Sequence, residues 1–379
     1  MMKFLLLASY PDSILKFRKN LIIDLQRKGF DVHVAAPNIK DNKTDLELFN
    51  TLGVTTHKIY LSRTGMNPLK DLFSLICLFF LMRRIAPDFV LCYTIKPIIY
   101  GVLSAKLAGI KNIIAMVTGV GIAFTDLSEN RLKGYVKSII TGLYTVSLKL
   151  SSKIIFQNTD DYDLFISLGI VNKDLDIAIV NGSGVDLEEF RVSPFPLGLS
   201  FLIVSRLLVS KGIREFVEAA RILKKKDPNA QFTIVGWVDE GGDSIKEVEV
   251  QEWVDEGVIS FLGRLDDVRP ALVECSVFVL PSYREGTPRS VLEAMAMGRP
   301  IITSDAPGCR ETVTNGVNGF LVEVKNVESL VSAMQKFKAQ PSLISIMGKC
   351  SRALVCKKYD VKKVNVQMMK GMGIDTDPV

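Results

Sequence analysis

The stretch PSYREGTPRSVLEAMAMGRPIIT, residues 281–303, decides the fold class. It follows a short apolar strand predicted at 277–280, passes through a loop that carries Glu285, opens a helix near Ser290 and reaches the next apolar strand after Gly298. Glu285 and Glu293 therefore bracket a helix N-terminus, which suits a phosphate because it offers unpaired N–H groups and the positive end of a dipole. A carboxylate on each side can hold sugar hydroxyls, so the stretch predicts a sugar-nucleotide site.

The rest of the chain repeats the same alternation of strands and helices. In the first half, strands are predicted at 3–8, 31–36, 55–59, 89–92, 112–117, 153–157 and 176–180, and in the second half at 201–205, 231–235, 258–262, 277–280, 300–303 and 319–322. Apolar runs between amphipathic helices indicate parallel sheets covered on both faces. We therefore expect an α/β protein with two Rossmann-like, doubly wound domains that face each other across a cleft, where such folds bind ligands.

Domain boundaries follow from breaks in this pattern. We expect a first domain at 1–187, a linker at 188–200 marked by Pro194, Pro196 and Gly198, and a second domain at 201–350. A tail follows at 351–379, for which a return to the first domain is one option. Two domains also agree with the length of 379 residues, of which 48% are apolar and 23% charged.

Composition excludes several classes of site. The six cysteines include no C-x-x-C pair, which indicates a reduced cytosolic protein, and His33 and His57 are the only histidines, which excludes most histidine-based metal and catalytic sites. No G-x-G-x-x-G follows a strand, so a dinucleotide oxidoreductase is excluded. Three Asp-x-Asp triplets, beginning at Asp161, Asp174 and Asp375, are interpreted as a helix start, a loop and a tail. We therefore expect no metal and no cofactor.

Two cations frame the start of the second domain. The segment SRLLVSKG places Arg206 at the end of one strand and Lys211 at the start of the next helix. Because the Glu285 loop leaves the same sheet edge, these cations are expected to clamp a diphosphate from the opposite side. For either cation alone, a solvated side chain would be the simpler interpretation.

The two segments SRLLVSKG (205–212) and EGTPRSVLEAMAMGRPIITSDAPGCRE (285–311) resemble the retaining glycosyltransferases of family 4, which have the GT-B fold. The E-x7-E motif of that family is matched by Glu285 and Glu293. NGSGVDLEEF (181–190) matches the stretch before the family's linker. YTIKPIIYG (93–101) and MVTGVGIAF (116–124) resemble a bacterial subgroup that adds hexosamines to undecaprenyl-diphosphate-linked sugars during O-antigen or capsule assembly.

The resemblance implies a role for each matching residue. Glu285 would contact hydroxyls of the donor hexose, Glu293 the ribose, and Arg206 and Lys211 the leaving diphosphate, so that Glu285, Lys211 and Arg206 form the catalytic group. The remaining donor-binding residues are Gly286, Thr287, Arg289, Ser290, Val291, Gly263 and Arg264. The reaction would retain the anomeric configuration, and the diphosphate itself would receive the acceptor's proton.

The acceptor side is expected in the first domain and departs from the family there. Thr118 and Gly119 stand in the loop where many relatives have a histidine, and Ser9 and Tyr10 stand where a glycine-rich turn is usual. Lys96, with Arg131 and Lys133, would meet the diphosphate of a lipid-linked acceptor; a surface lysine is the alternative. The apolar run 72–82, followed by two arginines, is either a core helix or a contact with an anionic membrane surface.

These observations lead to one expected function and its alternatives. We expect transfer of a hexose or N-acetylhexosamine, specifically GalNAc from UDP-GalNAc in α-linkage, to an undecaprenyl-diphosphate-linked sugar in O-antigen or capsular polysaccharide assembly. The expected location is cytoplasmic, peripheral on the inner face of the cytoplasmic membrane, with no nucleic-acid partner. The alternatives are a transferase to a soluble acceptor, a sugar-nucleotide epimerase, and an inactive scaffold that binds a nucleotide sugar.

Overall fold

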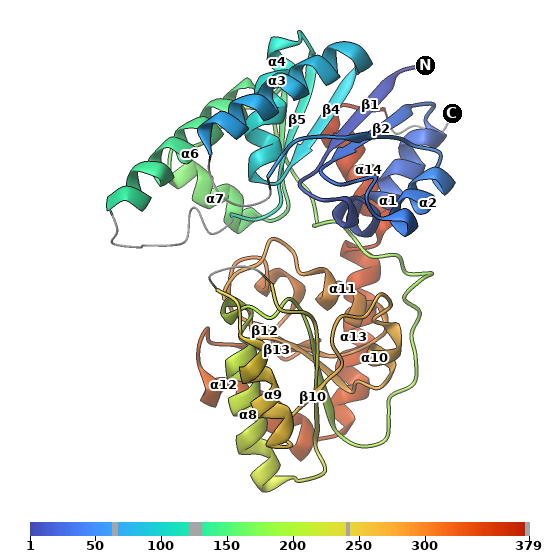
Figure 1. The fold of residues 1–379 in the computed structure, drawn as a ribbon. Coiled ribbons are helices and arrows are strands. Elements are labelled where there is room, and N and C mark those ends of the chain that lie inside the picture. The colour runs from blue at the N-terminus through green and yellow to red at the C-terminus, as the bar shows by residue number, and fades with distance from the viewer. Residues whose placement is uncertain (63–66, 121–130, 240–242, 376–379) are drawn as a thin grey trace. The chain divides into compact units, whose positions relative to one another are not determined.

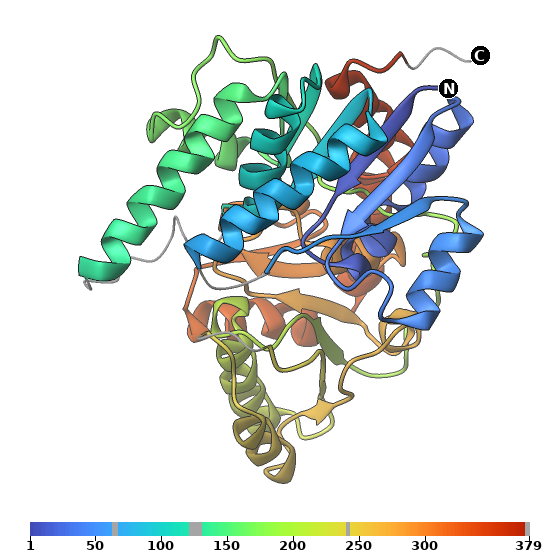
Figure 2. The same ribbon diagram turned by 45° about the horizontal axis from the view of Figure 1, so that its top comes forward.

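A computed structural model describes residues 1–62, 67–120, 131–239 and 243–375, with the side chains of 131–137 left out. The chain divides into two compact units, unit 1 (Met1–Ser183 with Val364–Val379) and unit 2 (Gly184–Lys363). Each unit is built around one parallel sheet with helices on both faces, so the predicted α/β class with two doubly wound domains is confirmed. Figures 1 and 2 show the two units from two directions.

The sheet of unit 1 has the strand order β3-β2-β1-β4-β5-β6-β7, and every neighbouring pair is parallel. Side chains alternate between its faces: Leu5 and Leu7 enter one core cluster, while Phe4 and Leu6 enter the other. The strand bounds are β1 Lys3–Leu7, β2 Asp31–Ala36, β3 Thr55–Lys58, β4 Phe89–Tyr93, β5 Asn112–Val117, β6 Lys153–Phe156 and β7 Ile177–Ile179.

Helices form a layer on each face of this sheet (Figure 1). One layer contains α3 (Pro68–Ile85), the π-helical turn η1 (Pro97–Gly101), α4 (Val102–Leu107), α6 (Arg131–Leu150) and α7 (Thr159–Ser167). The other contains α1 (Pro11–Arg27), α2 (Lys43–Thr51) and α14 (Val361–Met372). Gly101 lets η1 approach the sheet, since a Cβ there would lie 2.4 Å from the Leu7 side chain. Within the described part of the chain, no helix is both long and apolar enough to span a membrane.

The sheet of unit 2 has the strand order β10-β9-β8-β11-β12-β13 and is also parallel. Its strands are β8 Ser200–Val204, β9 Gln231–Val235, β10 Ser260–Phe261, β11 Val277–Leu280, β12 Ile301–Ser304 and β13 Gly319–Val322. Its helices are η2 Val209–Lys211, α8 Ile213–Lys226, α9 Glu247–Asp255, α10 Arg269–Val273, α11 Arg289–Ala296, η3 Arg310–Thr312, α12 Val327–Ala339 and α13 Ser342–Lys358. Helix α9, which is short and strongly charged, is not among the elements predicted from the sequence.

The segment between β7 and β8, which contains the expected linker, packs on unit 2. Phe190 is buried in the core of that unit. Arg299, fully buried, donates hydrogen bonds to the Ser193 carbonyl at 3.0 Å and to the Pro194 carbonyl at 2.8 Å. Its guanidinium also lies 4.7 Å from the ring centre of Phe195. Residues Phe190 and Ser193–Phe195 of this segment are therefore held by contacts within unit 2.

Candidate active site

The predicted donor residues of unit 2 lie on loops and in the short helices η2 and α11 that follow strands at the carboxyl edge of its sheet. Lys211 ends η2, directly after β8, and the next residue, Gly212, has a φ of +72°. A Cβ at Gly212 would lie 2.2 Å from the Pro281 carbonyl oxygen, so only glycine lets η2 approach the loop after β11 this closely. Backbone bonding fixes this approach, since the Tyr283 N–H donates to the Ser210 carbonyl at 2.9 Å.

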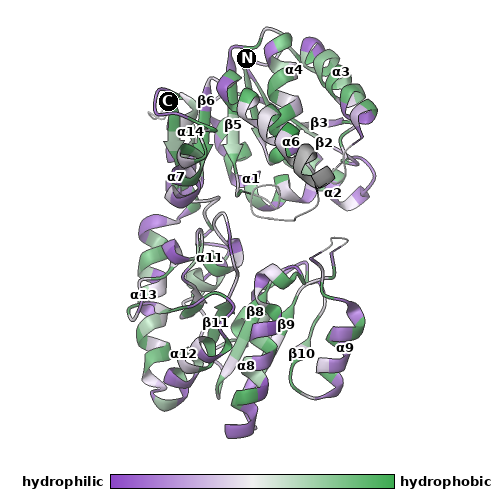
Figure 3. Ribbon diagram, turned by 90° about the vertical axis from the view of Figure 1, so that its left-hand side faces the viewer, coloured by the Kyte–Doolittle hydropathy of each residue, from purple (hydrophilic) through white to green (hydrophobic). Residues whose placement is uncertain are grey.

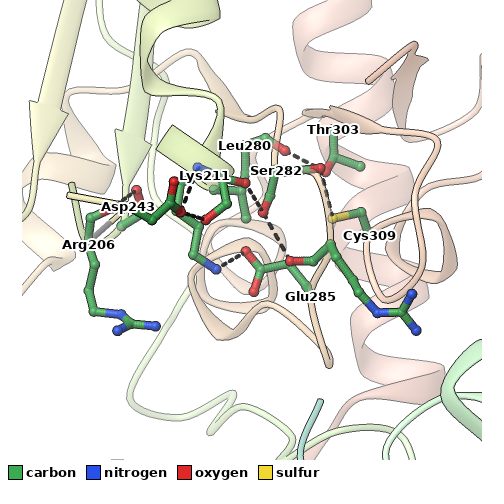
Figure 4. Close-up of polar contacts among 11 residues, drawn as sticks. Arg206, Lys211, Asp243, Leu280, Ser282, Glu285, Thr303 and Cys309 are labelled. Atoms are coloured by element: carbon green, nitrogen blue, oxygen red, sulfur yellow. Dashed lines mark hydrogen bonds and ion pairs between the residues drawn. The ribbon is translucent and has the colours of Figure 1, made fainter. Parts of the chain in front are cut away.

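Lys211 and Glu285 form an ion pair across these two loops (Figure 4). The Lys211 Nζ lies 2.5 Å from Glu285 Oε1, and the two side chains are only 15% and 14% exposed. The Glu285 N–H donates to the Pro307 carbonyl at 3.0 Å, and Gly308, with a φ of +75°, comes so close that its Cβ would lie 2.0 Å from the Glu285 carbonyl oxygen. Gly212 and Gly308 thus position the two charged groups at one sheet edge, where Lys211 and Glu285 were expected; their pairing with each other and the role of the glycines were not predicted.

Arg206, the second predicted cation, pairs with a carboxylate that the sequence analysis did not select. Its Nη1 lies 2.5 Å from Asp239 Oδ2. Figure 4 shows the Arg206 guanidinium apart from the Lys211–Glu285 contact. Arg206 and Lys211 therefore share a sheet edge, and each of them already has an anionic partner.

Helix α11 begins next to Glu285, as predicted. Its N-cap is Pro288, which offers no capping side chain. Arg289 Nε lies 2.8 Å from Glu293 Oε1, one helical turn further on, so the second glutamate of the motif is also ion-paired. The Val291 N–H donates to the Pro288 carbonyl at 3.1 Å, and the Val291 side chain is buried.

The remaining donor-side residues form the rim of the same edge. Thr287 donates its hydroxyl to the Gly286 carbonyl at 2.9 Å, and Ser290 is half-buried in the first turn of α11. Gly263 follows β10 and accepts a hydrogen bond from the Gly236 N–H at 2.9 Å. Arg264 stacks its guanidinium over Trp237, 5.2 Å from the ring centre. A planar cation on an indole gives this rim a flat, polarisable surface.

Asp243 contacts the loop that carries Lys211 and is not among the site residues predicted from the sequence. It accepts hydrogen bonds from the N–H and the hydroxyl of Ser210, the residue before Lys211. Ser282, after β11, donates to the Ser210 carbonyl at 3.2 Å. A sequence signal existed, because Asp239 and Asp243 follow β9, the neighbour of β8, and adjacent parallel strands end at one edge.

The predicted acceptor-side residues gather at the carboxyl edge of the sheet of unit 1. Ser9 follows β1 and its Oγ lies 2.5 Å from Thr94 Oγ1 after β4. Lys96 is largely buried and bonds Ser62 Oγ at 2.8 Å and Asp71 Oδ1 at 3.2 Å, so it is not a simple surface lysine. Thr118 and Gly119 follow β5, next to β4 in the sheet, and are half-buried.

A hollow of about 530 Å³ opens at this edge of unit 1, lined by Ser9, Tyr10, Lys58, Tyr60 and Ser62 among others. Tyr10 is the N-cap of α1. Gly121 and the side chains of Arg131 and Lys133 lie outside the described residues.

The described residues contain no group of three or more His, Cys, Asp or Glu side chains arranged to hold a metal ion. Asp161 lies in the first turn of α7, where its N–H donates to Asn158 Oδ1 at 2.7 Å, so the helix-start interpretation of the first triplet is confirmed. Asp174 lies in a loop, and Asp377 falls outside the described part of the chain.

Comparison with known proteins shows two matching family models. The model described as Glycosyl transferase 4-like matches residues 5–158, and the one described as Glycosyl transferases group 1 matches residues 198–339. Among solved structures, Anabaena HepE in complex with UDP and glucose superimposes with a TM-score of 0.78 at 18% identity, covering 98% of this chain and 100% of HepE. Sucrose-phosphate synthase from Thermosynechococcus elongatus gives a TM-score of 0.78 at 18% identity, covering 98% of each chain.

Two curated relatives extend along most of the chain. The N,N'-diacetylbacillosaminyl-diphospho-undecaprenol alpha-1,3-N-acetylgalactosaminyltransferase of Campylobacter jejuni is 31% identical over 336 residues, 84% of each chain. The UDP-Gal:alpha-D-GlcNAc-diphosphoundecaprenol alpha-1,3-galactosyltransferase of Escherichia coli is 29% identical over 324 residues, 81% of this chain and 80% of the relative. The chain therefore belongs to the group 1, family 4-like glycosyltransferases and has their GT-B fold.

Proposed function

We propose that this glycosyltransferase moves a hexose or N-acetylhexosamine from a UDP-sugar to an undecaprenyl-diphosphate-linked sugar during O-antigen or capsular polysaccharide assembly. The specific donor proposed is UDP-GalNAc, with transfer in α-linkage. The Campylobacter jejuni and Escherichia coli relatives support this proposal, because both are α-1,3-transferases that act on sugars carried by diphospho-undecaprenol.

The observation that carries the proposal is the Lys211–Glu285 contact at the carboxyl edge of unit 2, beside the start of α11. A cation, a carboxylate and a helix N-terminus on neighbouring loops can together bind the diphosphate and the sugar of a nucleotide sugar. The cation pairs with the diphosphate, and the carboxylate accepts a hydrogen bond from a sugar hydroxyl. The N-terminal turn of α11 favours negative charge nearby. A protein that only binds a nucleotide sugar would not need charged groups placed for both the sugar and the diphosphate, the two groups joined by the bond that breaks.

In the proposed reaction, the bond between the anomeric carbon and the diphosphate oxygen breaks, and the acceptor oxygen bonds to that carbon on the same face. The acceptor's proton passes to the leaving diphosphate, so no protein base is needed. Lys211 and Arg206 stabilise the charge that grows on the diphosphate, and Glu285 orients the hexose through its hydroxyls. Glu293 is assigned to the ribose. We propose that the reaction requires neither a metal nor a cofactor.

The acceptor is assigned to the carboxyl edge of unit 1. Ser9, Tyr10 and Lys96 stand around or beside the hollow there, and Thr118 and Gly119 follow the next strand. Hydroxyl groups suit a saccharide, and Lys96 offers a cation for its diphosphate. An acceptor carried on a lipid also implies that the enzyme works at a membrane surface, and we propose a peripheral location on the inner face of the cytoplasmic membrane.

The test is transfer from a panel of radiolabelled UDP-sugars into the lipid fraction of bacterial membranes, with EDTA present. The native protein is compared with Glu285→Gln and Lys211→Ala. The matched controls are Glu249→Gln and Arg214→Ala, which remove the partners of an exposed ion pair of 2.7 Å in the same unit. We expect label to enter lipid from one donor, to be lost in the two site variants and to be kept in the two controls.

Other outcomes separate the alternatives. Label in a soluble product alone would indicate a soluble acceptor, and conversion of one UDP-sugar into another would indicate an epimerase. UDP binding without any product would indicate a scaffold. Activity that EDTA abolishes and Mg²⁺ restores would overturn the metal-independent mechanism while leaving the transferase assignment in place.

A further inference from the structure

Helix α3 carries an apolar stripe on the side that faces away from the core of unit 1. The members of this α3 stripe are between 43% and 79% exposed: Leu69, Leu72, Phe73, Ile76 and Phe80. Steps of three and four residues place them on one helix face. The opposite face, with Leu78, Leu81, Met82 and Ile85, is buried against the sheet, so the fold does not need the stripe. Figure 3 shows hydrophobic colour along most of α3.

Positive charge accompanies the α3 stripe. Arg83 and Arg84, both exposed, follow Phe80 by three and four residues, which continues the stripe by one helical turn, and Lys70 is exposed near its start. The one acidic residue of α3, Asp71, is buried and paired with Lys96. The exposed face of the helix is therefore apolar and basic, with no carboxylate.

The α3 stripe is continuous with the hollow of unit 1 through an aromatic pair. Tyr60, 62% exposed, meets Phe73 edge to face with ring centres 5.4 Å apart. Tyr60 also lines the hollow, together with Ser9 and Tyr10. An exposed tyrosine, with an apolar ring and a polar hydroxyl, is favoured at the boundary between hydrocarbon and water.

We propose that the α3 stripe lies on the surface of an anionic lipid bilayer. Its apolar side chains enter the boundary between headgroups and acyl chains, and Arg83 and Arg84 contact anionic headgroups. This inference rests on the proposed function, which supplies a lipid-linked acceptor. Docking through α3 holds the hollow near the headgroups, so the acceptor's sugar can enter the hollow while its hydrocarbon stays in the bilayer.

Charge favours a bilayer over a second copy of this chain. In a symmetric contact between two α3 stripes, each surface would offer the same residues to the other. The stripe contains no carboxylate, so Arg83 and Arg84 would be covered without an anionic partner, which is costly. An anionic membrane supplies that partner along with apolar contact.

The test is co-sedimentation of the full chain, without substrate, with vesicles of phosphatidylcholine alone or mixed with phosphatidylglycerol. We expect binding to the mixed vesicles that weakens with salt. Phe73→Ser with Phe80→Ser should reduce the partition coefficient by about tenfold or more. Arg83→Gln with Arg84→Gln should reduce it by about 25-fold, at about fivefold for each basic residue. The controls are Val248→Ser with Ile346→Ser and Lys225→Gln with Lys226→Gln, which change similarly exposed residues of unit 2 and should bind as the native protein does.

Equal vesicle binding by the native protein and the stripe variants would overturn the inference, as would no binding at all. It would also be overturned if the native protein were a dimer that Phe73→Ser with Phe80→Ser converts to a monomer. Thermal unfolding checks that the variants fold. Failure of the proposed function gives a different result: no UDP-sugar labels lipid, although vesicle binding still depends on the stripe.

Discussion

Replacing Arg299 with Met should destabilise unit 2 severely without changing the chemistry of the site. Arg299 is fully buried and donates five hydrogen bonds, with Nε to the Leu272 carbonyl at 2.9 Å and the others to Ser193, Pro194 and Val273 at 2.6–3.3 Å. It thereby joins three segments of the chain. Because it is covered on all sides, it cannot touch a ligand.

The expected magnitude follows from the acceptors that would lose their donor. Leaving one buried polar group unsatisfied costs about 1–3 kcal/mol, and Arg299→Met strips donors from four carbonyls. Met fills much of the volume of the Arg299 side chain and removes a charge whose burial is itself costly. The summed cost of the four unsatisfied carbonyls is therefore an upper bound on the loss of stability. Substitutions that break a buried hydrogen-bond network lie at the upper end of measured effects, and we take about 3–5 kcal/mol as the expected value. For a unit of this size the melting temperature should fall by about 6–20 °C.

The assay is thermal unfolding of the full chain by calorimetry, with UDP binding measured well below the transition. Arg214→Met is the control, since Arg214 belongs to an exposed ion pair worth about 1 kcal/mol at most. Arg299→Lys should recover only part of the loss, because one ammonium cannot reproduce the planar fork. A melting temperature for Arg299→Met within about 2 °C of native, or loss of UDP binding at a temperature where the variant is folded, would refute this reasoning.

Three further predictions concern the turnover rate, the pH dependence of stability and a buried ion pair. Gly308→Ala should shift the Glu285 backbone and lower kcat by about 100-fold. The control Gly316→Ala, at a φ of +79° but with open space around it, should affect only stability. Steady-state kinetics and melting curves separate the two effects. Burial, then His33, Arg84 and Lys40, lower the pKa of His57 from 6.5 to about 4. Folding therefore favours the neutral form of His57, so the free energy of unfolding should fall as the pH drops from 6.5 towards 4. For this half-exposed ring we expect a loss of about 1–2 kcal/mol. His57→Gln should flatten that part of the curve of melting temperature against pH. Asp71→Asn should cost about 2–4 kcal/mol by urea unfolding, because it leaves Lys96 buried without its carboxylate, while Asp41→Asn, in an exposed pair with Lys58, should cost less than 1 kcal/mol; equal costs would contradict this.

Much of the fold could be predicted from the sequence because buried parallel strands are written as continuous apolar runs. The predicted strand at 277–280 matches β11, and the predicted strand at 319–322 matches β13. Helix α9 was missed because the nine residues EVEVQEWVD alternate Val with Glu, which obscures a helical period. The buried pair Val250 and Trp253, three residues apart, was the available signal.

The donor side was predictable where it depends on local sequence, but not in the ion pairs that join distant segments. The position of Glu285 before α11 follows from local sequence, and Arg289–Glu293 could have been read as a pair four residues apart on a helix. The partner of Arg206 could not be read locally, because Asp239 is 33 residues further along the chain and meets it only through the pairing of β8 with β9. The backbone contact of Gly308 with Glu285 is likewise a product of tertiary packing.

The ion pairs change how donor binding should be understood. Lys211, Arg206 and Arg289 are each held by a carboxylate, so the site is close to neutral before any donor arrives. In the proposed reaction the diphosphate takes over Lys211 and Arg206, which releases Glu285 to accept sugar hydroxyls. The carboxylates thus orient the cations in advance and reduce the cost of ordering them when the donor binds. The binding free energy of the diphosphate is reduced by the free energy of the ion pairs that it breaks, and this reduction favours release of the product UDP. Glu285 then has two roles in sequence, first as the partner that positions Lys211 and then as a ligand for the donor sugar, and Lys211 and Glu285 should act as one unit in catalysis rather than as two independent groups.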